Sequence, residues 1–485
     1  MRAGAISAAR LTDLLGGMPV DRPAYAALAD AVRVLVVDGR VSPGTRLPGE
    51  RDLAASLGTS RTTTARAYAE LVASGWATAR RGSGTTVTLP GTGRIASTVL
   101  LPREDDVLDL TAAASVASPG TAALVARALE GLPAVLRTNG YSPLGAPRLR
   151  ELVAARYAAR GLPTDPDQII VTPGALAAIA VVAHAVLGAG DRALVESPTY
   201  PNSLGALRGA GARVVGVPVG PDGWHPPTFA AALRQSAPRL AYLVPDFHNP
   251  TGMLMSAPQR EAIAATLRAN RTLAVVDECL VELDLAEGGA SDAAPMPPPF
   301  GAFDAGDENT VSLGSLSKPL WGGVRVGWLR APVGLRDRLL EARVSLELGS
   351  SALDQLVGVE FLTDPGPILA ERRGELRATR DAWHAELGAR LPDWRVPLPR
   401  GGLALWVELP QRLSGALTIA AERHGLALVP GARFTTDGTH AGRLRLPLTV
   451  PAAVVPDAVE RLAAAYADAL RRPDRAADGG PPLVA

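Results

Sequence analysis

Hydrophobic and polar positions repeat in two different ways along the 485 residues, and the change divides the chain. Over residues 21–88, apolar positions recur with a helical period in three stretches, the first of which is "YAALADAVRVLVVDG", before a short "ATARRGSGTTVTL" segment. Over residues 109–470, short β-branched or leucine-rich runs such as "TLAVVDE" and "NTVSLGS" alternate with helical patterns. Strands that alternate with helices predict an α/β domain with a largely parallel sheet.

The remaining stretches lack a steady period. Residues 89–108 contain Pro and Gly, so we interpret them as a linker. Residues 1–20 are predicted to be a flexible lead-in, and residues 471–485 a disordered tail. The predicted organisation is therefore a small domain at 21–88 and a large domain at 109–470.

Composition narrows the class of protein. Hydrophobic residues make up 47% of the chain and the net charge is +1, so the total charge indicates no particular partner. The single cysteine, Cys279, excludes an internal disulfide and fits a reducing compartment. The first residues lack the apolar core of a signal peptide, and no apolar run approaches the ~18 residues of a membrane span. We expect a soluble cytoplasmic protein.

The small domain has the layout of a winged helix-turn-helix. Pro48 lies at a helix start, Gly58 is suited to end that helix, and Thr59 or Ser60 can cap the next one. Residues 21–88 contain nine arginines and six acidic residues, which gives a modest basic excess. The alternative interpretation is a helical docking domain with a solvated charged face.

The full layout resembles the GntR family of bacterial repressors over residues 22–88, including "LPGERDLAASLGTSRTTTARAY" and "GSGTTV". The resemblance implies binding to a double-stranded DNA operator through the second helix, the start of the recognition helix and the wing. The contact residues that it implies are Arg51, Ser60, Arg61, Thr62, Thr63, Arg66 and Arg81.

The large domain contains a chemical peculiarity. Among 49 lysines and arginines, Lys318 is the single lysine, and it lies in "SLGSLSKPLWGGVRVGW". A guanidinium stays protonated at biological pH, whereas a desolvated amine can lose its proton and attack a carbonyl. The alternative is an ordinary solvated surface lysine.

The surrounding sequence contains what a lysine that binds pyridoxal 5′-phosphate needs. Such a site requires an acid for the pyridinium nitrogen, a donor for the 3′-oxygen, a ring for stacking, and donors for the phosphate. The candidates are Gly174, Ala175 and Leu176 at a helix start, Tyr200 for stacking, Asn249 for the 3′-oxygen, Asp277 for the ring nitrogen, and Ser315 and Arg325 for the phosphate. Each one alone has a structural alternative, such as a turn or a core aromatic, but their joint order favours the site.

That order resembles fold-type I aminotransferases. The resemblance adds Arg445, which would hold a substrate or effector carboxylate, and Tyr141, which would reach the phosphate of the neighbouring subunit. It implies that Lys318 is the catalytic residue that forms the Schiff base, and it implies no metal. "VDECLVEL" departs from the pattern, because Cys279 stands where these proteins usually have a tyrosine that helps to hold the 3′-oxygen. A thiol is a weak donor, so transamination is in doubt.

Taken together, the two halves resemble the MocR subfamily of GntR-type regulators over nearly the full chain. The resemblance implies a winged helix-turn-helix followed by an aminotransferase-like domain with a mostly parallel sheet and a smaller C-terminal α+β subdomain. It also implies a homodimer, in which each winged helix can pack against the large domain of the other protomer.

The residues are compatible with three functions. The favoured one is a DNA-binding regulator that senses an amino compound or pyridoxal phosphate through an aldimine at Lys318. The alternatives are an active aminotransferase with a DNA-binding appendage, and a repressor whose large domain is only a dimerisation scaffold. The intact Lys318, Asp277 and Arg325 speak against the scaffold.

Overall fold

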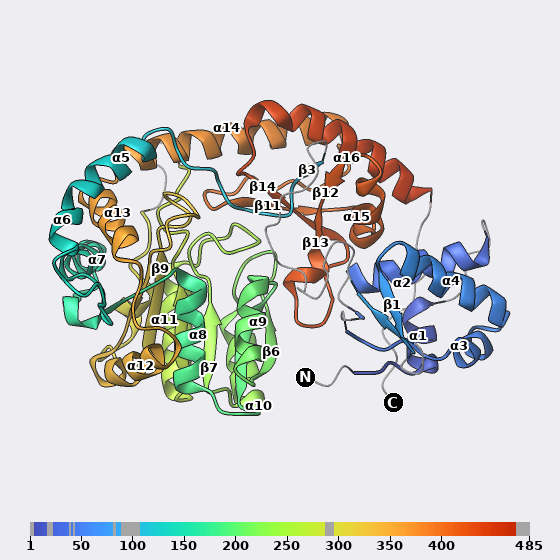
Figure 1. Cartoon of the computed structure of the whole chain (residues 1–485), viewed down its shortest axis with the longest axis horizontal. Coiled ribbons are helices and arrows are strands. Elements are labelled where there is room, and N and C mark those ends of the chain that lie inside the picture. The colour runs from blue at the N-terminus through green and yellow to red at the C-terminus, as the bar shows by residue number, and fades with distance from the viewer. Residues whose placement is uncertain are drawn as a thin grey trace.

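The computed structural model describes residues 4–16, 23–37, 40–41, 44–80, 84–88, 107–286 and 295–471. Figure 1 shows a small amino-terminal unit beside a large unit, which itself consists of a sheet-containing part and a carboxyl-terminal part. The long helix α14, Gly366–Arg390, runs from one of these parts to the other. Among the described residues, no helix has the length and apolar character needed to cross a membrane.

The amino-terminal unit is a winged helix-turn-helix. Its elements are α1 (Ala8–Leu15), α2 (Ala24–Val37), α3 (Glu50–Leu57), α4 (Arg61–Ala73), β1 (Ala77–Arg80) and β2 (Gly84–Val87). The two strands pair in antiparallel register, with Ala77 opposite Val87. Gly58 ends α3 in the left-handed conformation, and Ser60 caps α4, as the sequence predicts.

Part of the predicted flexible lead-in is an ordered helix, so that prediction is wrong for α1. Leu11, Leu14 and Leu15 are buried in the core of the winged helix. The hydroxyl groups of Thr12 and Ser56 lie 2.7 Å apart, which ties α1 to α3. The spacing of the three leucines places them on one face, and burial of that face orders the helix.

The central sheet has seven strands in the order β4-β10-β9-β8-β7-β5-β6. Only β10 runs against the others, which confirms the largely parallel sheet. The strands are β4 (Ile169–Thr172), β5 (Arg192–Ser197), β6 (Arg213–Pro218), β7 (Leu240–Leu243), β8 (Leu273–Asp277), β9 (Thr310–Ser315) and β10 (Gly327–Arg330).

Helices cover both faces of this sheet. Alternate residues of β7 and β8 point to opposite faces: Tyr242 and Val275 join the core under α8, α9 and α12, whereas Ala241 and Ala274 join the core under α10 and α11. The helices are α5 (Thr121–Ala128), α6 (Leu132–Val135), α7 (Pro147–Ala159), α8 (Ala175–Val186), α9 (Pro201–Gly209), α10 (Pro226–Ser236), α11 (Ala257–Ala269), α12 (Val333–Leu346) and α13 (Ala352–Thr363).

The carboxyl-terminal part is an α+β subdomain with its own core. Its strands form an antiparallel sheet in the order β11-β14-β13, and β12 pairs in parallel with β3. The elements are β3 (Leu108–Asp109), β11 (Ala404–Glu408), α15 (Ser414–Glu422), β12 (Leu426–Ala427), β13 (Val429–Pro430), β14 (Arg443–Pro447) and α16 (Val455–Leu470).

The winged helix lies against this subdomain through α2, which contacts α15 of the same chain. Figure 1 shows the two helices on neighbouring sides of the units. The predicted linker, 89–108, falls outside the described residues except at its end, where Leu108 already belongs to β3. The predicted tail, 471–485, lies outside them after Arg471. The domain boundaries stay predictions.

Candidate cofactor site and nucleic-acid interface

Lys318 lies in the turn that follows β9, at the carboxyl ends of the parallel strands. Its ammonium group donates a hydrogen bond to the carbonyl oxygen of Ala113, at 2.9 Å. The side chain therefore points into the fold and not into solvent. Binding sites of open α/β sheets form where strand ends converge in this way.

The electrostatic surroundings favour the neutral amine of Lys318. Burial lowers its pKa from the ordinary value, and the positive charges of Arg445 and Arg325 lower it further, against the opposite effect of Cys279 and Asp277. Each of these four residues is therefore near enough to Lys318 to act on its charge. A lysine with a lowered pKa is a better nucleophile near neutral pH.

Asp277 ends β8, and its carboxylate is 7% exposed. The hydroxyl of Tyr242 donates to Oδ2 at 2.7 Å, and the backbone N–H of Cys279 donates to Oδ1 at 3.0 Å. Sequence reasoning missed Tyr242. The signal was available, because β7 and β8 are consecutive strands of a parallel pair and their apolar runs align the tyrosine just before the aspartate.

A cradle for an anion lies at the start of α8. Gly174 precedes this helix with φ at 96°, and a Cβ atom there would lie 2.5 Å from Nη2 of Arg325. The guanidinium of Arg325 donates to the carbonyl of Pro173 at 2.8 Å and to the hydroxyl of Ser317 at 3.3 Å. Free backbone N–H groups at a helix start and an arginine together suit a phosphate.

The other residues predicted for this cradle lie beside it. Ala175 begins α8, and Leu176 is 39% exposed. The hydroxyl groups of Ser315 and Ser317 lie 2.8 Å apart, and that of Ser315 also donates to the carbonyl of Val326 at 3.1 Å. Ser317, whose hydroxyl accepts a hydrogen bond from Arg325, was not predicted as a site residue. Its position directly before Lys318 in the sequence was the available signal.

Tyr200 and Asn249 approach the same region from two further loops. Tyr200 precedes α9 and accepts a hydrogen bond from Asn202 at 2.9 Å. Burial raises the pKa of Tyr200. Asp277 and Cys279 raise it further, whereas the hydrogen bond from Asn202 and the positive charge of Arg445 lower it. Oδ1 of Asn249 is buried and has no hydrogen-bond partner in the described part of the chain. An unsatisfied buried amide oxygen is suited to accept a hydrogen bond from a bound group, and the NH2 group of the same side chain can donate one.

Cys279 contributes a protonated thiol. Burial raises its pKa well above the usual value, and the negative charge of Asp277 adds to this effect, although Lys318 opposes it. A thiol with a raised pKa is a poor nucleophile. This fits a structural role for the apolar thiol of Cys279 better than a redox-sensitive one.

Arg445 lies on β14 and is 6% exposed. Its guanidinium donates to the carbonyl of Thr111 and packs 5.2 Å from the ring centre of Phe434, while its Nε has no partner among the described residues. Burial lowers the pKa of Arg445 to about 10. A buried cation with unused donors is suited to a carboxylate ligand.

Residues 111–116, which we call the inner segment, close one side of this site. Besides Thr111 and Ala113, the carbonyl of Val116 accepts a hydrogen bond from Arg372 of α14 at 2.6 Å. Arg372 also donates to the carbonyl of Leu320, in the turn that carries Lys318, at 3.2 Å. The sequence pattern gave no sign of this segment's position, because carbonyl contacts carry no residue signature.

Tyr141 stands apart from the other candidates. Its side chain is 65% exposed on the surface of this chain. Its role for a neighbouring subunit stays a prediction.

The predicted DNA contacts gather at the starts of α3 and α4. Ser60 accepts a hydrogen bond from the backbone of Thr63 at 3.0 Å, which fixes the start of α4. The side chain of Arg61 is 60% exposed and lies 3.5 Å from Glu50. Arg51 and Thr62 are exposed as well, whereas Arg66 lies over the ring of Tyr25, at 4.0 Å. Arg81 lies outside the described residues.

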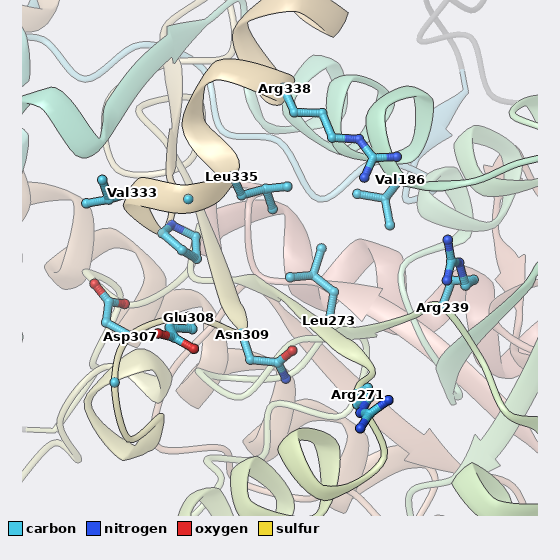
Figure 2. Close-up of a pocket in the computed structure, with 13 residues that line it drawn as sticks. Val186, Arg239, Arg271, Leu273, Asp307, Glu308, Asn309, Val333, Leu335 and Arg338 are labelled. Atoms are coloured by element: carbon cyan, nitrogen blue, oxygen red, sulfur yellow. The ribbon is translucent and has the colours of Figure 1, made fainter.

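A second concavity lies at the opposite end of the sheet, near the amino ends of β8 and β9. It encloses about 630 Å³ and is open to solvent. Figure 2 shows Arg239, Arg271 and Arg338 around it, together with the acidic Asp307 and Glu308. It shares none of its lining residues with the candidate cofactor site.

Comparison with known proteins agrees with this architecture. Residues 123–465 match the family model described as aminotransferase class I and II, and residues 24–87 match that of bacterial regulatory proteins of the gntR family. The probable rhizopine catabolism regulatory protein MocR of Rhizobium meliloti is 30% identical over 346 residues, which cover 65% of this chain and 67% of that protein.

Enzymes are similar to the large domain as well. The 2-aminoadipate transaminase of Thermus thermophilus is 31% identical over 313 residues, 64% of this chain and 75% of the enzyme. The crystal structure of LysN, an α-aminoadipate aminotransferase of the same species in complex with N-(5′-phosphopyridoxyl)-L-leucine, superposes with a TM-score of 0.67. It is 28% identical and covers 76% of this chain and 94% of that chain.

Proposed function

We infer the function from the families to which this chain belongs. It belongs to the aminotransferase class I and II family and, through its gntR-type amino-terminal region, to the MocR-type transcriptional regulators. It is a DNA-binding regulator whose large domain binds pyridoxal 5′-phosphate and senses a small amino compound. The observation that carries this proposal is the single lysine of the chain, whose amine points inward among Asp277, Arg325 and Arg445.

The residues fit the cofactor. Gly174 leaves room beside Arg325 that a Cβ atom would fill, so these two residues would hold the phosphate. Asp277 would face the ring nitrogen, and the side-chain NH2 group of Asn249 would donate to the 3′-oxygen, while its Oδ1, which has no partner among the described residues, can accept from another group. Tyr200 would stack on the ring. When bound, pyridoxal phosphate supplies an aldehyde that condenses with amines.

Absorbance tests the cofactor assignment. The purified full-length protein with added pyridoxal phosphate is expected to show a visible band that borohydride bleaches, with the added mass on the peptide that contains Lys318. Because the chain has one lysine, reduction labels one side chain. Lys318→Arg keeps the positive charge but cannot bond to an aldehyde carbon, so this variant should stay colourless. A wild type that takes up no cofactor would favour the scaffold interpretation.

The sensed ligand would carry an amine and a carboxylate. Its amine would reach the cofactor at Lys318, and its carboxylate would bind Arg445 in place of the Thr111 carbonyl. Residues 111–116 follow β3, which the predicted linker joins to the wing. A ligand that binds one arrangement of this segment better than the other would shift the placement of the winged helices.

The operator-bound form would be a homodimer that acts in the cytoplasm, with two winged helices on two half-sites. Large apolar side chains exposed around α6, α12 and α13 support paired large domains; they are Leu136, Tyr141, Leu346, Leu348 and Leu353. In this chain, α2 contacts α15 of its own protomer, and the same face of α15 would receive the partner's winged helix in an exchanged dimer.

Arg61 provides the test of the DNA interface. On the DNA that copurifies with the protein, Arg61→Ala should weaken binding roughly five- to a hundred-fold in a gel-shift titration, because this exposed arginine opens the recognition helix. Arg148→Ala on α7 is the matched control, since both side chains are 60% exposed. Equal affinity of the Arg61 variant and the wild type would contradict the assigned contact, and the visible band should persist in both variants.

An active aminotransferase is the second candidate, favoured by the transaminase that is 31% identical to the large domain. Against it stands Cys279, which lacks the phenol expected at that position. Steady turnover of an amino donor with a keto acid would support the enzyme, and binding without turnover would support the sensor.

A further inference from the structure

Tyr242 is a buried group that the proposed function leaves unused. It lies on β7, with no exposed surface, opposite Val275 of β8. Because side chains alternate along a strand, Val275 and Asp277 share a face of the sheet with Tyr242. The tyrosine therefore reaches forward along the strand direction, and its hydroxyl ends 2.7 Å from Oδ2 of Asp277. Figure 1 shows β7 inside the central sheet.

Cys279 also holds the carboxylate of Asp277. Its backbone N–H donates to Oδ1 at 3.0 Å, and its thiol hydrogen-bonds to the same carboxylate. Both oxygens are thus held by donors of the protein. This pairing fixes the plane of the carboxylate at the end of β8.

The surroundings of Tyr242 favour the protonated hydroxyl. Burial raises its pKa well above the usual value, and the charge of Asp277 and the hydrogen bond to it add to this effect. Tyr242 is consequently a permanent donor to Asp277. A donor to a carboxylate draws off part of its negative charge, which makes the carboxylate less basic.

We propose that Tyr242 is a positioning residue for the cofactor: its hydroxyl orients Asp277 and limits how strongly this carboxylate compensates the positive charge of the ring nitrogen. The inference rests on the proposed function, because it requires Asp277 to face that nitrogen. The role matters in this chain because position 279 is a cysteine and offers no phenol, whereas the phenol of Tyr242 bonds to the cofactor's predicted partner, Asp277.

Tyr242→Phe tests the proposal in the full-length protein with pyridoxal phosphate. Loss of the hydroxyl frees the carboxylate to rotate, so the dissociation constant of the cofactor should rise about ten-fold. The carboxylate also becomes more negative and compensates the ring charge more fully. The midpoint pH of the change in visible absorbance should therefore move upward by about half a unit to one unit.

Two comparisons separate this role from a purely structural one. Tyr68→Phe removes a buried hydroxyl of the winged helix, which donates to the carbonyl of Pro48 at 2.9 Å, and should change neither quantity. In an Asp277→Asn background, Tyr242→Phe should add little to either quantity, because the two residues act as a pair.

The outcomes are distinct. An upward shift of the midpoint that needs Asp277 supports the proposal. A Tyr242→Phe protein that melts at a lower temperature but has the wild-type midpoint and affinity overturns it and leaves the proposed function intact. A wild-type protein that takes up no cofactor overturns the proposed function itself.

Discussion

At the scale of single residues, the site depends on charges that act on a buried amine. Lys318 is the single lysine, and its neighbours Arg445 and Arg325 are both cations. Desolvation is the largest effect that disfavours the ammonium form, and the two positive charges act in the same direction, against Cys279 and Asp277. The effect is a larger fraction of free amine at neutral pH than an exposed lysine would have.

This has a consequence for pH dependence. The rate at which pyridoxal phosphate attaches to Lys318 should rise with pH to a plateau, with a midpoint below the ordinary value of 10.5. In Arg445→Gln the midpoint should move upward by roughly half a unit, because removal of a positive neighbour stabilises the ammonium form. Stopped-flow absorbance over a pH series measures both midpoints. A midpoint that does not move would contradict the coupling between the two residues.

At the scale of elements, short contacts tie parts of the chain that lie far apart in sequence. Arg372 of α14 donates to the carbonyls of Val116 and Leu320, and so joins the inner segment to the turn of Lys318. Arg445 of β14 holds the same segment at Thr111. The site therefore lies between the central sheet and the carboxyl-terminal subdomain. A relative movement of these two parts would change the contacts around the site.

The helix α1 gives a test of stability at the same scale. Leu11 is fully buried between α1 and the rest of the winged helix. Leu11→Ala should lower the free energy of unfolding of this unit by about 2–5 kcal/mol, through lost burial and a new cavity. Hydrogen exchange of peptides from residues 44–80 in increasing urea measures the effect. Arg10→Ala changes an exposed position of the same helix and should cost less than about 0.5 kcal/mol. Equal stability of both variants would mean that α1 contributes no core.

At the scale of the whole molecule, the exposed apolar side chains support the proposed homodimer. Leu136 is 73% exposed and Leu348 is 54% exposed. Leu136 precedes Tyr141 by five residues, and the residue after Leu348, Gly349, lies against Ser142, the residue after Tyr141. Monomeric proteins rarely leave several large apolar groups of this kind in water. A second copy of the chain would cover them and bring Tyr141 to the other site.

The assembly can be tested with charges on that surface. Leu348→Glu should convert a dimer into a monomer in sedimentation experiments, because burial of an unpaired carboxylate opposes association. Val333→Glu is the control: Val333 is 73% exposed at the start of α12, beside the second concavity. A Leu348 variant with the wild-type mass in solution would place the interface elsewhere.

Much of this molecule follows from its sequence. The alternation of apolar runs with helical patterns determined the α/β class, and Gly58 and Ser60 fixed the ends of α3 and α4. These features are local, since a helix period, a cap or a strand end is written in adjacent residues. The prediction of a flexible lead-in was wrong for α1. The leucines of this helix occupy a single turn, and their burial depends on packing against α3.

The sequence alone established which residue types carry the chemistry: one lysine, an aspartate at a strand end, and two arginines further along the chain. The groups that surround these residues depend on the three-dimensional arrangement of the chain. Tyr242 contacts Asp277 because β7 and β8 pair in a particular register. The backbone carbonyls of Thr111 and Ala113 accept hydrogen bonds from Arg445 and Lys318, respectively. Such contacts depend on strand order and chain path, and the strand order of this sheet is not the order of the sequence.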